Sequence, residues 1–487
     1  MSLNDTTRAA PRTAAVSGPG AGRLGLALVV IATAQLMLVL DDTIVNVALP
    51  SMQRSLHIAT PHLNWVISFY ALAFGGLLLA GGRAADTFGR LRMFRVGVTV
   101  FAAASMAGGL ARSETVLIAA RLVQGGGAAI AAPAALSLLA TTFPAGPART
   151  KALGVYGSMA GLGSVVGLLL GGALTTYASW RWVLFINVPI AVAVLAGSRM
   201  LVSGEREAGR LDIVGAVTAT LSIGSIIYGL TRGNTNGWTD PGTLACFASG
   251  AALLVVFFVV ERAARSPLVP RRVVRDRNRA GAYTVMLLLG AGMLSMFYLL
   301  TLYMQIVRGY SAIHTGLAYL PFVAGVGVAS GGLAPRLLAA LPARAVGATG
   351  ALLFSGALAW EVAALSPASN YFEVLLPALF VSGLALGLVY VACTAVGMRG
   401  VAATDTGIAG GLVNTGLQLG ASVGVSATAA IASIVTRSHL PGHAAAVAMT
   451  DGYVGGLLAG SIIAAAAAVV ALIAINARLS ADEIAVH

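Results

Sequence analysis

The chain has 487 residues, of which 58% are hydrophobic and only 10% are charged, and its mean hydropathy is +0.88. A water-soluble domain carries about 25% charged residues, so this chain cannot cover a water-facing surface and the composition excludes a soluble fold. The formal net charge of +13 does not indicate a nucleic-acid partner, because most basic residues stand in short stretches between apolar runs.

Apolar runs long enough to cross a bilayer recur along the chain. A helix needs about 20 apolar residues to span the hydrocarbon core. We therefore expect an all-α polytopic membrane protein with fourteen transmembrane helices and no water-soluble domain. The expected spans are residues 24–49, 62–81, 93–111, 114–140, 150–176, 182–202, 212–231, 243–261, 281–306, 314–334, 345–365, 371–395, 406–435 and 453–476.

The basic residues alternate along the chain in a way that orients these spans. Of the 30 Lys and Arg residues, 23 fall on one set of alternate connections and 6 on the other, and Arg121 lies within a span. Cytoplasmic loops of membrane proteins are enriched in Lys and Arg. We therefore expect a multi-pass protein of the cell (inner or plasma) membrane, with both termini in the cytoplasm.

The densest basic stretch runs from Arg262 to Arg279 and has two interpretations. It can be a topology anchor between two halves of the chain, or it can bind anionic lipid head groups. The sequence does not separate the two. Cys246 and Cys393 lie far apart within apolar spans, so they indicate neither a disulfide framework nor a metal cluster.

Two stretches of the chain resemble one another. Residues 81–92 read GGRAADTFGRLR, and residues 331–347 repeat the same Gly-start, basic-end pattern in degraded form. Paired repeats with a substrate site between them are typical of secondary transporters. We therefore expect two six-helix bundles, residues 24–202 and 281–476, separated by an inserted two-helix hairpin with a basic loop (203–280). Residues 1–23 and 477–487 are predicted to be cytoplasmic tails, the first of them disordered.

Several motifs carry a resemblance to a known family. Leu40–Pro50 (LDDTIVNVALP) resembles the Leu-Asp-x-Thr-Ile-Val-Asn-Val-Ala-Leu-Pro signature of the fourteen-helix drug:proton antiporter branch of the major facilitator superfamily. Residues 82–92 resemble the superfamily's Gly-x-Leu-Ala-Asp-Arg-x-Gly-Arg-Arg loop, with departures at Ala84, Thr87 and Leu91. Further matches are RLVQGGGAA (121–129), SWRWVLFINVPI (179–190) and GGLVNTGLQLGASVG (410–424).

The resemblance implies a proton-coupled exporter of lipophilic or cationic small organic molecules, including drugs and antibiotics, that works by alternating access. It implies no cofactor beyond the proton gradient, and its expected partners are a small-molecule substrate, protons and the lipid bilayer, with the chain acting as a monomer. Leu168 stands where exporters of this superfamily carry Pro. That departure keeps a second interpretation open, a transporter of one metabolite with another direction or coupling ion.

Other functional classes fit the sequence poorly. A membrane-embedded enzyme would need a nucleophile, a base and metal ligands at depth, and the spans offer little beyond a few acids and Arg121. The glycine-rich stretch of the fifth span has the wrong spacing for a nucleotide-binding loop and follows no strand. His439 and His443 are separated by Pro441 and Gly442, which disfavours a helical metal pair, so no metal site is predicted.

Charged residues within spans are the strongest indication of a functional site, because each costs about 2.5–3.5 kcal/mol on insertion scales. Asp41 and Asp42 lie in the first span, and Arg121 lies near the start of the fourth. We predict that Asp41, together with Asp42, takes up the coupling proton while Arg121 adjusts its affinity. The alternative is a fixed ion pair between the first and fourth helices that only holds the bundle together.

The loop after the second span is predicted to form a cytoplasmic gate. Its glycines permit a tight turn, and its acid can cap a helix or pair with an arginine. The predicted gate residues are Gly82, Asp86, Gly89, Arg90 and Arg92. The alternative is that the loop only supplies positive charge for topology.

Two further groups of residues complete the predictions. Glycines at spacings of three and four let helices approach closely, so Gly163, Gly167 and Gly171 are expected to pack the fifth span against a neighbour. A mixed aromatic and polar lining is expected for the substrate cavity. Its candidates are Asn46, Gln124, Trp182, Phe185, Tyr298, Trp360, Glu361, Asn414 and Gln418.

Overall fold

The computed structural model describes residues 21–143, 147–201, 213–264, 267–269, 271–401 and 406–476. All regular structure within these ranges is helical, and fourteen of the helical stretches are long and apolar enough to cross a membrane. The prediction of an all-α protein with fourteen spans is therefore confirmed. The expected tails, 1–23 and 477–487, lie outside the described residues except for the first residues of the first helix.

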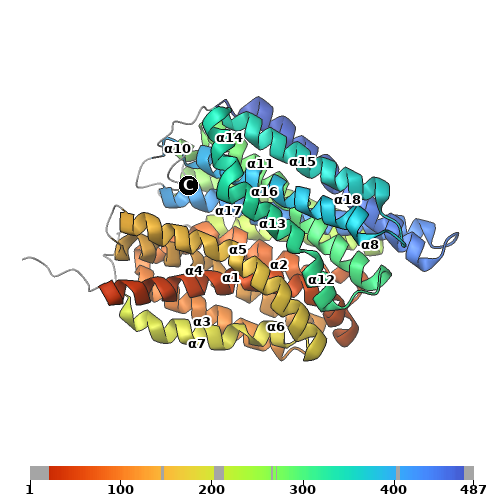
Figure 1. Cartoon of the computed structure of the whole chain (residues 1–487), viewed down its shortest axis with the longest axis horizontal. Helices are drawn as coiled ribbons and strands as arrows, with labels where there is room; N and C mark the ends of the chain where they lie inside the picture. The colour runs from red at the N-terminus through yellow and green to blue at the C-terminus, as the bar shows by residue number, and fades with distance from the viewer. Residues whose placement is uncertain are drawn as a thin grey trace, which may run out of the picture.

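The first half of the chain builds one bundle (Figure 1). Its elements are α1 (Ala21–Leu56), η1 (Thr60–His62), α2 (Trp65–Phe88), α3 (Arg90–Gly109), α4 (Glu114–Thr142), α5 (Pro147–Tyr177), α6 (Trp182–Phe185), α7 (Asn187–Gly197) and η2 (Ser198–Met200). The predicted sixth span is thus divided into α6, α7 and η2, although Ile186 between α6 and α7 keeps helical backbone angles and Trp182–Met200 forms one span.

The second half builds the other bundle. Its elements are α10 (Arg271–Val274), α11 (Arg277–Leu302), η3 (Tyr303–Val307), α12 (Ala312–Ala318), α13 (Leu320–Val328), η4 (Ala329–Leu333), α14 (Ala334–Ala340), α15 (Ala343–Ala364), η5 (Tyr371–Leu375), α16 (Leu376–Met398), α17 (Thr406–His439) and α18 (Ala445–Ala474). The three η elements of this half are π-turns. Such turns occur within longer helices, often at functional sites.

A hairpin of α8 (Ile213–Asn236) and α9 (Pro241–Ala263) follows the first bundle. Asp240 caps α9 by accepting a hydrogen bond from the Thr243 amide, and Arg232 Nε donates to the same carboxylate oxygen at 2.8 Å. The hydrogen bond from Arg232 lowers the pKa of Asp240. Helix α8 contacts both α2 and α17, and Trp65 Nε1 donates to Thr231 Oγ1 at 2.8 Å. The hairpin therefore touches both halves.

Each half packs its first helix closely against its fifth. Glycines of α5 face α1, and a Cβ added at Gly171 would come 2.8 Å from the carbonyl oxygen of Ile44. Glycines of α17 face α11 in the same manner. The pairs are Gly163 with Val39, Gly167 with Thr43, Gly171 with Ile44, Gly416 with Tyr283, Gly420 with Leu287 and Gly424 with Ala291. The two bundles thus share one construction, which agrees with the sequence repeat.

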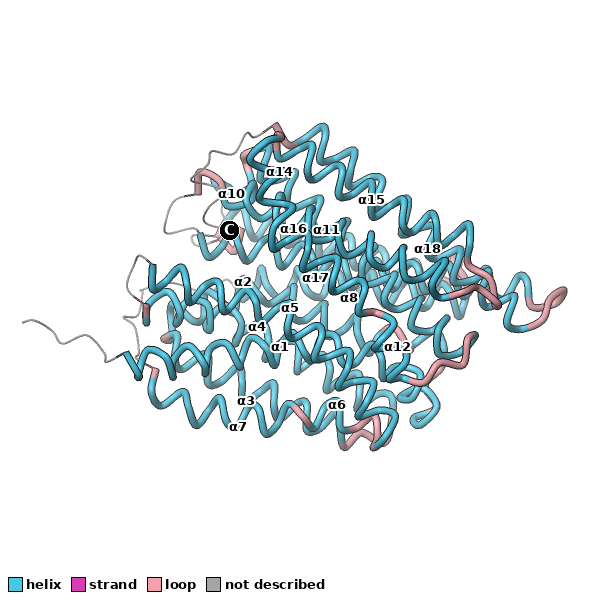
Figure 2. Tube along the Cα trace, viewed as in Figure 1, coloured by secondary structure: helices cyan, strands magenta, loops and turns pink. Residues whose placement is uncertain are grey.

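Helix α1 begins and α18 ends at the same end of the molecule, here called the terminal end, which is at the left of Figure 1. The opposite end, at the right, is called the distal end, and Figure 2 shows the loops that join the helices there. The halves are joined toward the distal end. Gln305 Nε2 donates to the Val47 carbonyl at 2.8 Å, and Asn64 Nδ2 donates to Ser426 Oγ at 3.1 Å.

Helix α5 of the first bundle and the helical stretch α12–η4 of the second bundle separate from one another toward the terminal end. In the distal part of α5, a Cβ at Gly172 would collide with Ile313 of α12. Further toward the terminal end, an added Cβ would meet no atom within 4 Å. This holds for Gly154, Gly157 and Gly161 of α5 and for Gly327, Gly331 and Gly332 of α13 and η4. The two helices therefore touch at the distal end and diverge from it, as Figure 1 shows for α5 and α14.

Candidate functional site

A buried carboxylate lies at the centre of the first bundle. Asp41 of α1 has no exposed surface, and its carboxylate accepts three hydrogen bonds from two other helices, α4 and α7. Arg121 Nη1 of α4 donates to Oδ2 at 2.6 Å, and Gln124 Nε2 and Asn187 Nδ2 each donate to Oδ1 at 2.7 Å. A buried charge is tolerated only where a partner charge and hydrogen bonds replace water. Asp41 has both.

Arg121 is held as firmly as the acid it pairs with. Its Nε donates to the carbonyl of Val66 at 3.0 Å, and its guanidinium lies 4.2 Å from the centre of the Tyr70 ring. Its Nη1 also donates to Gln124 Oε1 at 2.8 Å. Cation–π contact and hydrogen bonds to α2 together fix the planar guanidinium. The Asp41–Arg121 pair therefore links α1, α2 and α4.

A second layer of hydrogen bonds orients the two amides. Ser105 Oγ of α3 accepts from Gln124 Nε2 at 3.1 Å and from Asn187 Nδ2 at 3.0 Å. The same hydroxyl donates to the carbonyl of Leu184 at 2.8 Å. Because Ser105 has one donor and uses it on a backbone carbonyl, both amide groups must present N–H to it. This arrangement directs their other N–H toward Asp41.

Asp42 differs from its neighbour in exposure and in hydrogen bonding. It is partly exposed rather than buried, and no hydrogen bond to its carboxyl is present among the described residues. Its backbone carbonyl accepts from Asn46 Nδ2 at 2.9 Å, which leaves the acid itself available. The first span thus carries one fully paired acid and one unpaired acid side by side.

The predicted gate residues lie at the terminal end between α2 and α3. Gly89 separates the two helices with φ of 101°, a conformation that favours glycine. Across this break, Arg90 Nη2 and Asp86 Oδ1 form an ion pair of 3.1 Å. Arg92 is exposed and Gly82 packs near Pro133. The contacts named here lie within the first half, and no contact of Asp86 with the second half is present among the described residues.

The nine predicted cavity residues do not gather at one place. Gln124 belongs to the Asp41 site, and Tyr298 and Glu361 are buried within the second bundle, so these three do not line an open cavity in this conformation. Gln418 lies against Gly75, where α17 meets α2. The others are Asn46, buried on α1; Phe185, half-buried against Gly109; and Trp182, Trp360 and Asn414, exposed.

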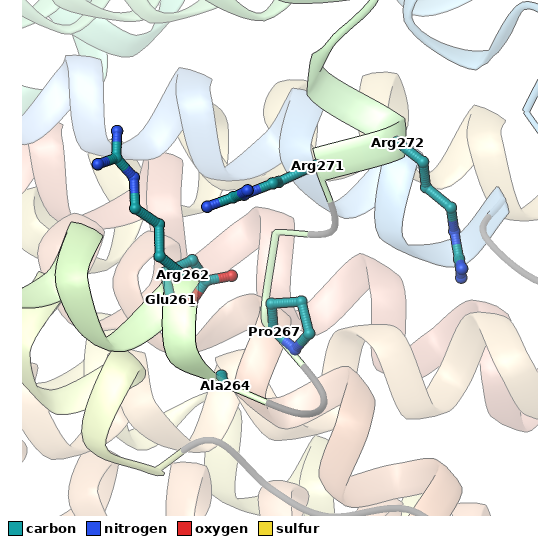
Figure 3. A pocket seen from close by; sticks show the side chains of 6 residues that line it. All are labelled: Glu261, Arg262, Ala264, Pro267, Arg271 and Arg272. Atoms are coloured by element: carbon teal, nitrogen blue, oxygen red, sulfur yellow. The ribbon is translucent and has the colours of Figure 1, made fainter.

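The basic segment after α9 forms a hollow at the terminal end (Figure 3). Its volume is about 320 Å³, and Arg271 extends from α10 toward the end of α9 whereas Arg272 points away from it. Arg83 of α2 donates to the Pro267 carbonyl at 2.9 Å, which ties the segment to the first bundle. The lining residues are Glu261, Arg262, Ala264, Pro267, Arg271 and Arg272.

Similarity to known proteins identifies the family. The family model described as Major Facilitator Superfamily matches residues 31–425. The chain belongs to this superfamily. The match covers the helices of both bundles and the hairpin between them, from α1 into α17. It confirms the resemblance found in the sequence motifs and makes the chain a multi-pass membrane protein.

Relatives of the chain within the superfamily are resistance and export proteins. Puromycin resistance protein pur8 of Streptomyces alboniger is 40% identical over 449 residues, which cover 91% of this chain and 89% of that protein. Cephamycin export protein CmcT of Amycolatopsis lactamdurans is 39% identical, covering 88% of this chain and 89% of that protein. The lincomycin resistance protein of Streptomyces lincolnensis is 35% identical, with 90% and 89% covered.

Solved structures with a similar fold are described as transporters as well. A bacterial homologue of the human lysosomal transporter Spinster, in an inward-facing and unoccupied conformation, has a TM-score of 0.65 and 16% identity, covering 94% of this chain and 98% of that chain. An auto-inhibited peptide transporter of the POT family has a TM-score of 0.67 and 14% identity, with 94% and 98% covered. At these identities the likeness shows the fold alone.

Several residues around Asp41 could not be identified from the sequence. Asn187 lies within the quoted segment 179–190 and Ser105 within the third span, but neither was a candidate. An Asn in an otherwise apolar run was the available signal for the first, since amides are rare in lipid. Tyr70 carried no signal, because its role depends on Arg121 lying above its ring.

Proposed function

We propose that the protein exports antibiotics or similar lipophilic or cationic small molecules across the cell membrane in exchange for protons. The length of the similarity to puromycin resistance, cephamycin export and lincomycin resistance proteins supports the substrate class. The single observation that carries proton coupling is the pair of adjacent acids in the first span. One is locked in a buried ion pair and the other is unpaired and partly exposed.

The two acids take different parts in the proposed cycle. Asp41 and Arg121 keep a fixed charge pair at the centre of the first bundle. Asp42 exchanges the proton, because its carboxyl has no hydrogen bond to lose. A neighbouring negative charge favours proton uptake and a nearby guanidinium opposes it. A small change in the distance from Asp42 to Arg121 between conformations therefore switches Asp42 between binding and releasing its proton.

The proposed exchange uses alternating access between the two bundles. The halves touch at the distal end, and α5 parts from the second bundle toward the terminal end. The excess of basic residues on connections at the terminal end supports a cytoplasmic location for that end. The protein then collects its substrate from the cytoplasmic side in this conformation. We propose that it does so as a monomer, without a cofactor.

The Asp86–Arg90 pair is the proposed cytoplasmic gate element. It holds the turn at Gly89, where α2 ends and α3 begins. When the terminal ends of the bundles approach one another, this turn presents a fixed surface to the second half. Asp86→Ala is expected to insert normally but to lower turnover, measured as initial transport rate at equal protein in the membrane. Unchanged turnover would support a role in topology alone.

The test of the proposed function is substrate-triggered proton movement in proteoliposomes that hold the purified protein. A lumenal pH dye is read while puromycin or tetraphenylphosphonium is added. The wild type should move protons when compound is added, and Asp42→Asn should abolish that movement while leaving the protein folded. Glu373→Gln, which changes an exposed acid outside the site, is the matched control.

Three outcomes decide the proposal. Proton movement that depends on compound and is lost in Asp42→Asn supports it. Proton movement that survives in both Asp42→Asn and Asp41→Asn places coupling elsewhere and refutes the assigned roles. Compound transport without any proton movement refutes proton exchange and favours the other interpretation of the sequence, a carrier with another coupling ion.

A further inference from the structure

The second bundle contains a carboxyl in an environment unlike that of any other described acid. Glu361 of α15 has no exposed surface, and neither of its carboxylate oxygens has a hydrogen-bond partner among the described residues. The side chain lies one turn from the distal end of α15, which ends at Ala364. An ionised carboxylate without partner charge or donors is strongly disfavoured at such a place.

The groups around Glu361 do not supply a cation. The elements packed against α15 are α11, α14, α16, α18 and η5. Their titratable side chains are Arg277, Arg279, Tyr283 and Tyr298 on α11, Arg336 on α14, Tyr390 and Cys393 on α16, Asp451 and Tyr453 on α18, and Tyr371 and Glu373 on η5. Arg277 and Arg279 lie in the first turn of α11, at the terminal end. None of these forms a hydrogen bond with the Glu361 carboxyl. On α15 itself, Arg344 lies at the opposite end of the helix.

Tyr319 is the titratable group that does interact electrostatically with Glu361. Its hydroxyl is already engaged, because it donates to the Phe297 carbonyl at 2.9 Å and lies 3.0 Å from Thr301 Oγ1. Tyr319 is fully buried at the junction of α12 and α13. The carboxyl therefore faces a polar group in an apolar bundle, but that group cannot neutralise it.

The same helices of each half contribute to the two sites. In the first bundle, the first, second and third helices supply Asp41, Tyr70 and Ser105. In the second bundle, the corresponding helices supply Thr301, Tyr319 and Glu361. The fourth helix differs, because α4 carries Arg121 whereas α16 contains no Lys, Arg or His. The second bundle thus carries its buried acid on the third helix instead of the first, and no cation among the described residues forms a hydrogen bond with it.

We propose that Glu361 is a second proton-binding site of the transport cycle. It holds a proton in the conformation seen here and releases the proton when the second bundle rearranges toward the distal-open state. A metal ion does not fit, because Na⁺, Mg²⁺ or Ca²⁺ would need several oxygen ligands together. A proton needs only the carboxyl. This inference rests on the proposed proton exchange, which it extends from the first bundle to the second.

Infrared spectroscopy of the full-length protein in lipid nanodiscs tests the bound proton without any substrate. A protonated carboxyl has a carbonyl stretch that an ionised one lacks. At neutral pH the wild type and Glu373→Gln should show this band, and Glu361→Gln should lose one carboxyl's worth of it. If the wild type and Glu361→Gln have the same band, the proposal is wrong. If Glu361→Gln does not fold, glutamate-specific ¹³C labelling of the wild type replaces it, and a band that does not shift refutes the proposal.

Counting protons per puromycin in proteoliposomes tests the release step. Glu361→Gln should move fewer protons per puromycin than wild type and Glu373→Gln. An unchanged ratio would show that the proton at Glu361 stays bound and would refute a role in the cycle. These failures differ from failure of the proposed function, in which the wild type itself moves no protons with puromycin while the infrared band can still be present.

Discussion

Each half of the molecule buries a carboxylic acid, and the two acids are treated in opposite ways. Asp41 in the first bundle accepts hydrogen bonds from a guanidinium and two amides. Glu361 in the second bundle accepts none from the described residues. The bundles share their helix order and their glycine-lined packing of first helix on fifth. The side-chain partners of the two acids therefore differ although the order of the helices is shared, and this difference separates a fixed charge from an acid that can change its charge.

The largest loss of stability and transport is expected when the buried acid of the first bundle, Asp41, is left without a partner, as Glu361 is among the described residues of the second bundle. Arg121→Ala removes the cation and leaves Asp41 buried and unpaired. Removing one partner of a buried ion pair costs about 3–5 kcal/mol. The thermal unfolding temperature in detergent should fall sharply and transport should be lost. Arg112→Ala, which removes an exposed arginine from the same half, should change neither.

The double variant Asp41→Asn/Arg121→Ala distinguishes loss of pairing from loss of volume. It removes both charges, so it should be more stable than Arg121→Ala alone. Equal instability of the single and double variants would mean that Arg121 stabilises the bundle through Val66 and Tyr70 and not through Asp41. In that case the contrast between the two sites would lose its electrostatic basis.

Much of the fold could be predicted from the sequence, because each span is a local property of about 20 apolar residues. The breaks within spans could not. The π-turn at 303–307 ends the helix begun by α11, and the one at 329–333 lies between α13 and α14, two residues before Pro335. Likewise Asp41 and Arg121 were found as charges in lipid, since each stands out within its own helix.

The side chains that surround each buried acid, and so determine whether it keeps a charge, could not be predicted from the sequence. Asn187 reaches Asp41 across 146 residues of chain, and helix periodicity does not say which helices meet. The sequence predicts that Gln124 lines a substrate cavity, because polar residues in spans often line one. In the structure its side chain donates a hydrogen bond to Asp41. Glu361 was visible as an acid within a span, but its lack of partners is a property of the packed bundle alone.

A smaller loss of stability, equal in the two halves, is expected from substitutions in the packing of the first helix on the fifth, because both halves share this packing. Gly171→Ala and Gly424→Ala each place a Cβ within 3.0 Å of backbone atoms of the facing first helix. Overpacking of this kind costs about 1–3 kcal/mol. Both variants should therefore lower the unfolding temperature by similar amounts. A loss confined to one half would show that the bundles are not built alike.

Glycines without neighbours provide matched controls in each half. A Cβ added at Gly157 of α5 or at Gly327 of α13 meets no atom within 4 Å. Because Ala is favoured over Gly in helices by up to about 1 kcal/mol, Gly157→Ala and Gly327→Ala should leave the unfolding temperature unchanged or raise it. A large fall in the unfolding temperature of either variant would mean that these glycines are in close contact with another helix in the dominant conformation.

The smallest effect concerns the contact that joins the halves at the distal end. Ser426 Oγ accepts from Asn64 Nδ2 at 3.1 Å, lies 3.2 Å from Ser68 Oγ and donates to the Ser422 carbonyl. Ser426→Ala removes the hydrogen bonds of α17 with Asn64 and Ser68 and leaves the packing of α17 on α2 in place. Two hydrogen bonds contribute about 1–2 kcal/mol together, so the distal-closed state should lose roughly five- to thirtyfold in population relative to the distal-open state.

Spin labels at exposed distal positions of each half can measure this shift. Labels at Arg112→Cys and Phe372→Cys, in a background without Cys246 and Cys393, should give one short distance in the parent and an added longer distance in Ser426→Ala. Ser438→Ala, whose hydroxyl bonds only within α17, is the control and should keep the short distance. An unchanged distribution in Ser426→Ala would mean that packing of α5 on α12 closes the distal end without help from these hydrogen bonds. The two bundles would then be held together at the distal end without help from Ser426, through that packing and the remaining hydrogen bond from Gln305 to the Val47 carbonyl.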